Sequence, residues 1–224
     1  RLCNKKKIIP MTKYNFDKFH YLRKFKTNKV IGLAFNYKSM LKKKINYNEP
    51  LIFFKSNTSL IRNRESIIYP SGFKKVWIEA ELCIIIGKTC KNIKSKESKD
   101  YILGYTCGND ITAENVLNRD WHLARSKGLD SFAPIGPSLI TDIGTDNLKI
   151  KSFINGKKTQ DSNTNDRILN DAECVELVSK FVTLYPGDII FTGTPAGALD
   201  AIIKPGDEVI VEIEKIGKLT NKVK

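Results

Sequence analysis

The sequence predicts a single β-rich domain with few helices, and three observations support this. Its 224 residues suit one domain of ordinary size that can bury a real core. Short apolar segments of strand type recur along the chain, and turn residues such as Asn155-Gly156, Pro186-Gly187 and Pro205-Gly206 separate them. No internal repeat and no linker rich in proline or glycine divides the chain. These features favour a mainly β fold over alternating strands and helices.

The expected strands are short runs of β-branched and apolar residues. In chain order they cover residues 29–34, 50–54, 66–69, 77–87, 101–107, 138–141, 149–154, 188–192 and 208–213. A first helix is expected over residues 112–120, directly after one of these strands. A second helix is expected over residues 171–181, where apolar residues recur with helical spacing and Asn170 or Asp171 can cap the N-terminus.

Basic residues outnumber acidic ones, which gives a formal net charge of +14 at pH 7. They are scattered along the chain, and no recognisable nucleic-acid motif accompanies them. We therefore expect a solvated basic surface, no nucleic-acid partner, and a positive field that attracts anionic substrates. The longest apolar run, residues 82–86, is far too short to cross a membrane, so no membrane partner is expected.

Cysteine and histidine are poorly suited here to bind a metal. The five cysteines are odd in number and none forms a close pair, which favours reduced thiols in an intracellular compartment. A disulfide framework and a zinc site are not expected. The two histidines, His20 and His122, are too few for a site built from several histidines.

The N-terminal segment differs in composition from the rest. Residues 1–28 are basic, with Asp17 as their one acid, and lack the apolar core of a secretory signal. We expect a poorly ordered or partial N-terminal extension over 1–28, ahead of one domain over 29–224, with the true start upstream of Arg1. The predicted location is cytoplasmic, and a mitochondrial or other organellar location is the alternative.

Two glutamates stand out in an apolar segment. Glu79 and Glu81 are two residues apart, so on a strand both side chains point to the same face. Two like charges at a partly buried position are costly unless a cation compensates them. Alone, the pair is more typical of an exposed strand face with solvated acids. A third acid, Asp110, ends the strand-like segment 101–110 and favours a metal site.

Three carboxylates without a histidine form an oxygen-only ligand set that suits Mg²⁺, Mn²⁺ or Ca²⁺ rather than zinc. On an octahedral ion they leave positions for water and for a chelating substrate. A 2-oxo acid fills two such positions with its carboxylate and keto oxygens. The ion then stabilises, as a Lewis acid, the enolate that isomerisation, decarboxylation or C–C cleavage requires.

Several segments resemble known motifs when they are taken in order. They are Glu79-Ala-Glu-Leu, Leu103-Gly-Tyr-Thr with Asn109-Asp110, Lys127-Gly-Leu-Asp-Ser-Phe-Ala-Pro-Ile-Gly-Pro137, Asn155-Gly, Gln160-Asp161 with Asn163-Thr164, and Tyr185-Pro-Gly-Asp-Ile-Ile-Phe-Thr-Gly-Thr-Pro-Ala-Gly197. Together they resemble the fumarylacetoacetate hydrolase family, and the resemblance runs from about Val30 to Val223. Each motif alone is weak, but six in the family's order are specific.

The resemblance implies a fold of the α+β class, mainly β, with a mixed β-roll and few helices, usually in a homodimer. It implies that Glu79, Glu81 and Asp110 are metal ligands for Mg²⁺ or Mn²⁺. Lys127 matches the family's active-site lysine, whose ammonium stabilises an oxyanion or moves a proton. Thr194 matches a threonine that contacts substrate, and Lys55 matches a lysine near the pocket, although Ser56 replaces the family's proline.

Two departures from the family pattern bear on the reaction. Hydrolytic members resembling acylpyruvate hydrolase carry a lid motif, N-Y-x-x-H-x-x-E, whose histidine and glutamate activate water. Here Met40 and Lys43 occupy those two positions, and neither can act as that base. After Asp110, the family's usual arginine and glutamine are also missing. Arg119, His122 or Arg125 are the candidates to replace them.

The predicted function is therefore metal-dependent keto–enol isomerisation or decarboxylation of a small 2-oxo dicarboxylate. Hydrolysis of an acylpyruvate or fumarylpyruvate is the alternative within the enzyme class, and it needs a replacement base, for which Glu49 is a weak candidate. A metal-binding pseudoenzyme that has lost the lid pair is the alternative from another class.

Overall fold

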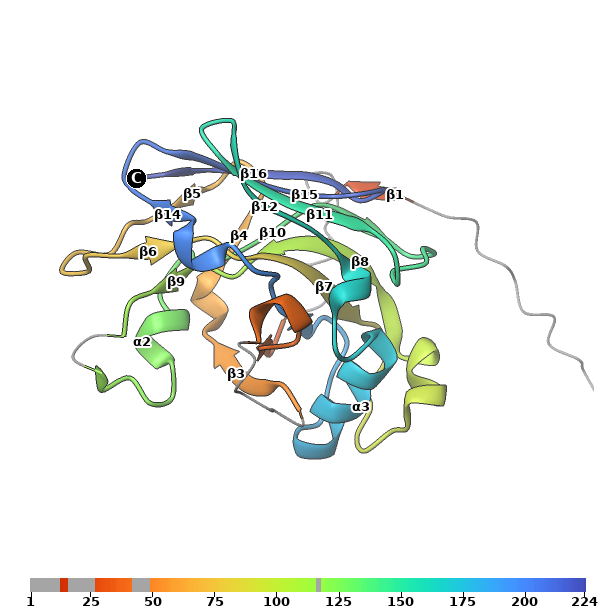
Figure 1. Cartoon of the computed structure of the whole chain (residues 1–224). Coiled ribbons are helices and arrows are strands. Elements are labelled where there is room, and N and C mark those ends of the chain that lie inside the picture. The colour runs from red at the N-terminus through yellow and green to blue at the C-terminus, as the bar shows by residue number, and fades with distance from the viewer. Residues whose placement is uncertain (1–12, 16–26, 42–48, 116–117) are drawn as a thin grey trace, which may run out of the picture.

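The computed structural model describes residues 13–15, 27–41, 49–115 and 118–224, with side chains from residue 27 onward. Strands dominate the described chain and build three curled sheets, with few helices on the outside (Figure 1). The predicted α+β, mainly β fold class is confirmed.

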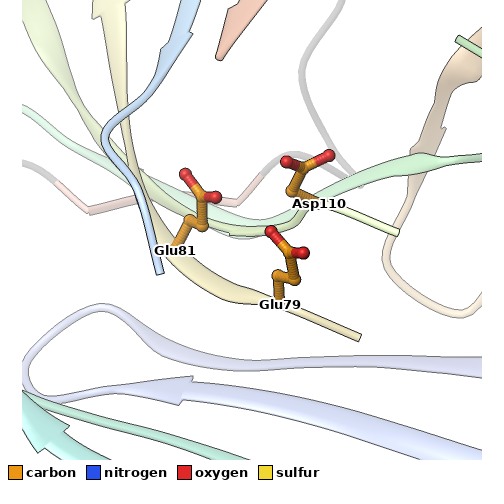
Figure 2. A group of neighbouring side chains, drawn as sticks. All are labelled: Glu79, Glu81 and Asp110. Atoms are coloured by element: carbon orange, nitrogen blue, oxygen red, sulfur yellow. The ribbon is translucent and has the colours of Figure 1, made fainter. Parts of the chain in front are cut away.

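The largest sheet has the strand order β1-β10-β8-β7-β13-β2-β3, and β4 pairs with β10. Every residue of β7 is buried, because this strand lies in the middle of the sheet. The antiparallel register of β7 and β8 places Ala80 opposite Asn109, so the ends that carry the three predicted acids meet (Figure 2). The strands of this sheet are β1 (Lys13–Asn15), β2 (Val30–Ala34), β3 (Leu51–Lys55), β4 (Leu60–Arg62), β7 (Ala80–Ile86), β8 (Ile102–Asn109), β10 (Ala133–Ile140) and β13 (Ile189–Phe191).

A second sheet has the order β12-β11-β15-β16-β5 and packs on the first. In β15 the buried residues alternate, since successive side chains point to opposite faces of a strand. Val211 and Leu219 of this sheet share a core with Leu82 and Cys107 of the first. Its strands are β5 (Ser66–Ile67), β11 (Lys149–Ile154), β12 (Lys157–Asn163), β15 (Glu208–Ile213) and β16 (Gly217–Val223).

A small third sheet lies beside the acids and consists of β14 (Ile202–Ile203), β6 (Val76–Trp77) and β9 (Thr112–Ala113). Strand β6 pairs with both of its neighbours, and residues 78 and 79 then connect it to β7. This sheet therefore fixes the chain on the N-terminal side of Glu79 and on the C-terminal side of Asp110.

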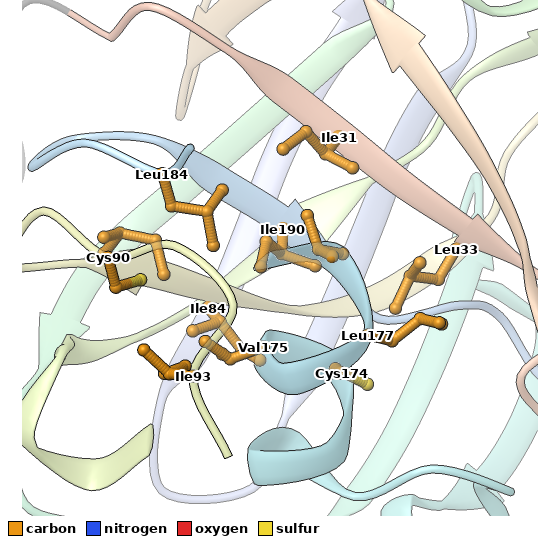
Figure 3. Packing of buried hydrophobic residues seen from close by; sticks show 12 residues of the cluster. Ile31, Leu33, Ile84, Cys90, Ile93, Cys174, Val175, Leu177, Leu184 and Ile190 are labelled. Carbon is orange, nitrogen blue, oxygen red and sulfur yellow. The ribbon is translucent and has the colours of Figure 1, made fainter. Parts of the chain in front are cut away.

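Helix α3 (Asp171–Phe181) matches the prediction for residues 171–181. It begins at a capping box, in which Asn170 accepts a hydrogen bond from the Glu173 amide and Glu173 accepts one from the Asn170 amide. Val175 and Val178 pack against Ile84 and Ile190 of the largest sheet (Figure 3). Leu82, which packs against the second sheet, and Ile84 lie two residues apart on β7 and therefore on one face, so α3 and the second sheet cover neighbouring parts of the same face.

The prediction of a helix over residues 112–120 is wrong. Thr112 and Ala113 pair with Val76 and Trp77 as strand β9, and Asn118 has a φ of 52°, which a right-handed helix does not allow. The helix begins later, as the short α2 (Ala124–Lys127).

The continuous strand predicted over residues 77–87 is also wrong. It is broken at residues 78–79, because the Ile78 amide donates to the Ala201 carbonyl. Several observed strands lie outside the predicted set, and the two longest of them are β12 and β16. Strand β12 is polar in sequence and follows a tight turn at Asn155-Gly156, where both residues have positive φ.

Three residues of the predicted N-terminal extension form β1, which pairs with the end of β10. Residues 1–12 and 16–26 lie outside the described residues, so the extension over 1–28 stays a prediction. Within the described part of the chain, no helix is both long and apolar enough to cross a membrane.

Four cysteines are described, and all of them are free and buried: Cys83, Cys90, Cys107 and Cys174. Burial raises the pKa of each thiol, to about 12 for Cys107 and Cys174. These side chains therefore pack as small apolar groups. Cys3 lies outside the described residues.

Candidate metal and acid-binding site

The three predicted acids come together at the ends of two paired strands. Glu79 lies in the connection between β6 and β7, Glu81 lies in β7, and Asp110 follows β8 directly. Each offers one carboxylate oxygen, and these oxygens all lie within 4.8 Å of one another (Figure 2). We call this group the acid cluster. The predicted proximity of the three side chains is thus present in the structure.

The backbone holds Glu79 although it has left the strand. The Asp110 amide donates to the Glu79 carbonyl at 2.9 Å, and the Glu79 amide donates to Asn109 Oδ1 at 3.1 Å. These bonds tie the two segments together where the regular β7–β8 ladder ends at Ala80 and Asn109. The acid pair therefore depends on this local crosslink and not on the alternation of one strand.

Two lysines reach into the acid cluster. Lys55 ends strand β3, and its ammonium is 2.5 Å from Asp110 Oδ1. Lys127 ends helix α2, and its ammonium is 2.6 Å from Asp110 Oδ2 and 2.9 Å from Glu79 Oε2. Both lysines were predicted from the sequence, and the structure places both on Asp110.

The charges in the cluster do not cancel, because three carboxylates face two ammonium groups. The pKa of Glu81 is raised well above its usual value, mainly by burial and further by the negative charges of Asp110 and Glu79. Burial acts in the same direction on Asp110, but Lys127 and Lys55 outweigh it and lower the pKa of that carboxyl. Glu81 therefore carries the least compensated charge of the cluster.

The same interactions separate the two lysines. Burial acts to lower the pKa of Lys127, but Asp110 and Glu79 outweigh it and raise this pKa above its usual value. Burial lowers the pKa of Lys55 as well, and there the attraction of Asp110 does not fully restore it. Lys127 is therefore firmly cationic in this arrangement, while the charge of Lys55 is held less strongly.

The residues present fit a divalent cation that prefers oxygen ligands. The acid cluster offers only carboxylate oxygens, its members are buried or nearly so, and its three carboxylates outnumber the two ammonium groups, which favours a bound cation. Glu81 accepts one hydrogen bond, at Oε2, from the Gly193 amide at 2.6 Å. Its carboxylate is thus oriented by the backbone.

Two residues that the sequence analysis missed hold Glu79. The Trp77 indole donates to Glu79 Oε1 at 2.8 Å, and the Thr112 hydroxyl donates to the same oxygen at 3.0 Å. Lys127 in turn donates to Thr112 Oγ1 at 2.6 Å. Both residues lie two positions from an acid of the cluster, and their positions in the small sheet β6–β9 were not predicted.

Thr194 is buried, and it lies next to the acid cluster in the loop that follows β13. It follows Gly193, which contacts Glu81, and its hydroxyl accepts a hydrogen bond from Gln160 Nε2 at 2.9 Å. Gln160 Oε1 accepts from the Ala80 amide at 3.0 Å. Gln160 therefore links Thr194 to the residue between Glu79 and Glu81. In the sequence, Gln160 stands out only as part of a motif.

The structure does not bring the other candidates into the cluster. Met40 is half-buried in a 3₁₀ turn (Lys38–Met40), and Lys43 lies outside the described residues. Glu49 lines a separate hollow together with Phe54 and Phe181. The exposed side chains of Arg119, His122 and Arg125 make no hydrogen bond or ion pair with the three acids.

The fold and the site thus define a mainly β protein with a buried cluster of carboxylates and lysines. A family model described as fumarylacetoacetate (FAA) hydrolase C-terminal matches residues 29–224. An uncharacterised protein of Methanocaldococcus jannaschii is 45% identical over 206 residues, which cover 91% of this chain and 86% of that protein. The chain belongs to the fumarylacetoacetate hydrolase family.

Relatives with named activities are similar to most of the chain. The mitochondrial oxaloacetate tautomerase of Rattus norvegicus is 40% identical over 188 residues, 78% of this chain and 58% of that protein. The crystal structure of 5-carboxymethyl-2-hydroxymuconate delta-isomerase from Mycobacterium smegmatis matches with a TM-score of 0.82 and 37% identity, over 88% of this chain and 78% of that chain.

A third similar structure contains a metal ion. It is fumarylpyruvate hydrolase from Pseudomonas aeruginosa in complex with Mn²⁺ and pyruvate, with a TM-score of 0.79 and 26% identity, over 88% of this chain and 89% of that chain. The relatives therefore include a tautomerase, an isomerase and a hydrolase.

Proposed function

We propose that this protein is a divalent-metal-dependent enzyme that acts on small 2-oxo or enol acids by keto–enol isomerisation or decarboxylation. The observation that carries the proposal is the acid cluster, in which three buried carboxylates lie within 4.8 Å and two lysines contact one of them. Glu79, Glu81 and Asp110 are the proposed ligands of Mg²⁺ or Mn²⁺. The bound ion would supply Lewis-acid stabilisation of an enolate.

The protein's own residues supply the remaining chemistry. Lys127 stays protonated beside two carboxylates, so its role is to stabilise negative charge on a substrate oxygen or to donate a proton. Lys55 and Thr194 border the cluster from two other segments and are the proposed substrate-binding residues. The positive net charge of the chain attracts the anionic substrate.

The choice of isomerisation or decarboxylation rests on the missing base. Water-driven C–C cleavage needs a general base, and Met40 occupies the position where hydrolytic members carry a histidine. The names of two relatives, an oxaloacetate tautomerase and a hydroxymuconate isomerase, agree with a reaction at an enol. Such a reaction moves a proton and consumes no water.

Hydrolysis of an acylpyruvate or fumarylpyruvate is the second candidate, because the similar fumarylpyruvate hydrolase binds Mn²⁺ and pyruvate. Incubation with acylpyruvate in ¹⁸O-labelled water separates the two. Label in the carboxylate product supports hydrolysis, whereas consumption of oxaloacetate enol without incorporation from water into a cleavage product supports our proposal.

The third candidate is not an enzyme but a metal-binding pseudoenzyme. It keeps the three acids and lacks the lid histidine and glutamate, as Met40 and Lys43 indicate. Tight binding of Mn²⁺ and oxalate without turnover of oxaloacetate or acylpyruvates supports it.

We also propose a homodimer of one catalytic domain over residues 29–224, with small 2-oxo acids as ligands and neither nucleic acid nor membrane as partner. The cytoplasm is the proposed location, and mitochondria are the alternative, because one relative is mitochondrial.

The decisive experiment measures the ketonisation of oxaloacetate enol by ultraviolet absorbance, with EDTA and with Mg²⁺ or Mn²⁺. The wild-type protein should be active only with metal. Glu79→Ala should abolish both Mn²⁺ binding and turnover, while Glu208→Ala, a glutamate of β15 on the second sheet, should change neither. Mn²⁺ affinity that survives in Glu79→Ala would refute the proposed site.

A further inference from the structure

The hydroxyl group of Tyr37 is unusual among the described residues. The side chain is fully buried, and its hydroxyl has no hydrogen-bond partner among the residues that the structure describes. Buried polar groups are nearly always paired, because an unpaired one costs the free energy of its lost hydration. An unpaired buried hydroxyl therefore calls for an explanation.

Several charged groups influence the pKa of this hydroxyl. One cation, Arg167, and three carboxylates, Glu81, Asp166 and Asp171, act on it. Asp171 forms an ion pair with Arg167 at 2.5 Å, and Asp166 precedes Arg167 in the sequence. We call Arg167, Asp166 and Asp171 the Arg167 group. Glu81 is the remaining acid and belongs to the acid cluster. The geometry agrees with this, because Asn36, the neighbour of Tyr37, contacts Gly193, whose amide donates to Glu81, while the backbone of Tyr37 pairs with that of Arg167.

Arg167 is already engaged in other contacts. Besides Asp171, it donates to the Thr164 carbonyl at 3.1 Å and to the Thr145 carbonyl at 3.3 Å. Burial raises the pKa of Tyr37, so the phenol keeps its proton and remains a hydrogen-bond donor. Within the described chain, that donor has no acceptor.

Tyr37 is held in place by its neighbour in sequence. Asn36 Nδ2 donates to the Thr192 carbonyl at 2.8 Å, and Asn36 Oδ1 accepts from the Leu169 amide at 2.8 Å. The backbone of Tyr37 also pairs with that of Arg167. The backbone of Tyr37 is therefore anchored between the loop that carries Gly193 and the segment that precedes α3. Such anchoring pre-organises a donor for a ligand.

We propose that the hydroxyl of Tyr37 is a substrate-binding group of this site, which donates a hydrogen bond to an oxygen atom of the 2-oxo acid bound beside Glu81. This inference rests on the proposed function and adds a residue to which that function assigns no role. In the ligand-bound state the buried hydroxyl gains the acceptor that the protein itself does not provide.

A pair of tyrosine-to-phenylalanine variants tests this. Tyr105 is the matched control, because its hydroxyl interacts with Asp171 and Thr145 of the protein, both of which affect its pKa. Tyr37→Phe and Tyr105→Phe each remove one hydroxyl and keep the ring. Melting temperature, Mn²⁺ affinity and the affinity of the Mn²⁺-loaded protein for oxalate are measured for both variants and for the wild type by thermal denaturation and calorimetry.

Tyr37→Phe should melt at or above the wild-type temperature, bind Mn²⁺ unchanged, and bind oxalate on the order of 10-fold more weakly. Tyr105→Phe should melt lower and bind oxalate as the wild type does. Equal oxalate affinity in Tyr37→Phe overturns the role of Tyr37 alone, as does a melting temperature that drops as in Tyr105→Phe. A wild-type protein that binds neither Mn²⁺ nor oxalate overturns the proposed function as well.

A measurement on the wild-type protein covers the case in which Tyr37→Phe does not fold. A buried phenol that begins to donate a hydrogen bond changes its ultraviolet absorption. Oxalate added to the Mn²⁺-loaded protein should therefore produce a tyrosine difference band. A spectrum without such a band overturns the proposal.

Discussion

Lys55 and Lys127 share one carboxylate, and each holds a different oxygen of Asp110, at 2.5 Å and 2.6 Å. They come from strand β3 and helix α2, which lie far apart in the sequence. The two ammonium groups are not equivalent, because Lys127 also contacts Glu79 and Lys55 does not. The pKa of Lys127 is raised and that of Lys55 is lowered, so the two lysines can serve different roles in one reaction.

Lys127→Met should lower turnover about 10²- to 10³-fold, since it removes the group that we propose to stabilise negative charge on the substrate. It should also tighten Mn²⁺ binding, because a cation that competes for Glu79 and Asp110 is gone. Steady-state kinetics and calorimetric titration measure the two effects. The control is Lys180→Met, an exposed lysine of α3. Wild-type turnover in Lys127→Met would contradict the role given to this residue.

Glu81→Gln should stabilise the metal-free protein at neutral pH. The folded-state pKa of Glu81 is raised, by burial first, so the folded protein binds its proton more tightly than the unfolded chain does. Its contribution to stability is therefore present below about pH 4.3, the unfolded value, and is lost as the pH rises to the folded pKa. The glutamine variant lacks this loss.

Thermal denaturation in EDTA at a series of pH values checks this, with the difference between wild type and Glu81→Gln as the readout. This difference in melting temperature reports the pH dependence due to Glu81 and removes that of Asp110, whose pKa is shifted in the opposite direction. Added Mn²⁺ should raise the melting temperature of the wild type but not of the variant. Equal EDTA melting temperatures at neutral pH would be inconsistent with an uncompensated Glu81.

Asp120→Ala should cost about 1–2 kcal/mol of unfolding free energy and reduce turnover. The N-cap residue of helix α2 is Leu123, but Asp120 caps the first turn from outside, because its carboxylate accepts hydrogen bonds from the amide and hydroxyl of Ser126, both at 2.6 Å. The loss should misplace Lys127, which ends this helix. Chemical denaturation and kinetics measure both effects. Asp142→Ala, at an exposed position, should be neutral.

The pH dependence of this cap has the opposite sign to that of Glu81. Burial acts to raise the pKa of Asp120, but the hydrogen bonds from Ser126 and Arg125 outweigh it and lower this pKa. The cap therefore stabilises the fold above about pH 3.9, the unfolded value, and its contribution is lost as the pH falls through the folded pKa. An Asp120→Ala effect that grows on acidification would contradict this.

Gly193→Ala should be more damaging than Gly72→Ala, although both glycines have positive φ. A methyl group at Gly193 would lie 2.9 Å from Asn36 Cβ and from the Leu33 carbonyl, whereas nothing lies within 4 Å of one at Gly72. Backbone strain alone should cost about 1 kcal/mol at Gly72, and the clash should add about 1–3 kcal/mol at Gly193.

Urea denaturation measures both glycine variants. Gly193→Ala should also weaken Mn²⁺ binding, because the Gly193 amide orients Glu81. Equal stability of the two variants would show that the loop relaxes around the added methyl group.

Local signals in the sequence predict part of this molecule well. Helix α3 was predicted at its observed bounds, because the capping box at Asn170 and the apolar spacing both lie within the helix itself. The proximity of Glu79, Glu81 and Asp110 was predicted as well, since the two acidic segments each adjoin a strand and the two strands pair.

Contacts between distant segments could not be predicted in this way. Thr112 and Ala113 have a helix-compatible neighbourhood, and only their pairing with Val76 and Trp77 makes them a strand. Strand β12 is polar because it lies at the edge of the second sheet among the described strands, so it lacks an apolar pattern. Tyr37 stands at the tyrosine of the lid motif, but no role for its hydroxyl could be predicted, because that role depends on which groups surround it.

Four buried thiols can report local opening of the fold: those of Cys83, Cys90, Cys107 and Cys174. Only a thiolate reacts with alkylating reagents, and burial disfavours the thiolate at each of these positions. Alkylation at these four positions therefore requires the surrounding layers to open. Peptide mapping of the modified cysteines would then give a separate alkylation rate for each position. Bound Mn²⁺ would lower this rate at the cysteines whose surroundings it stabilises.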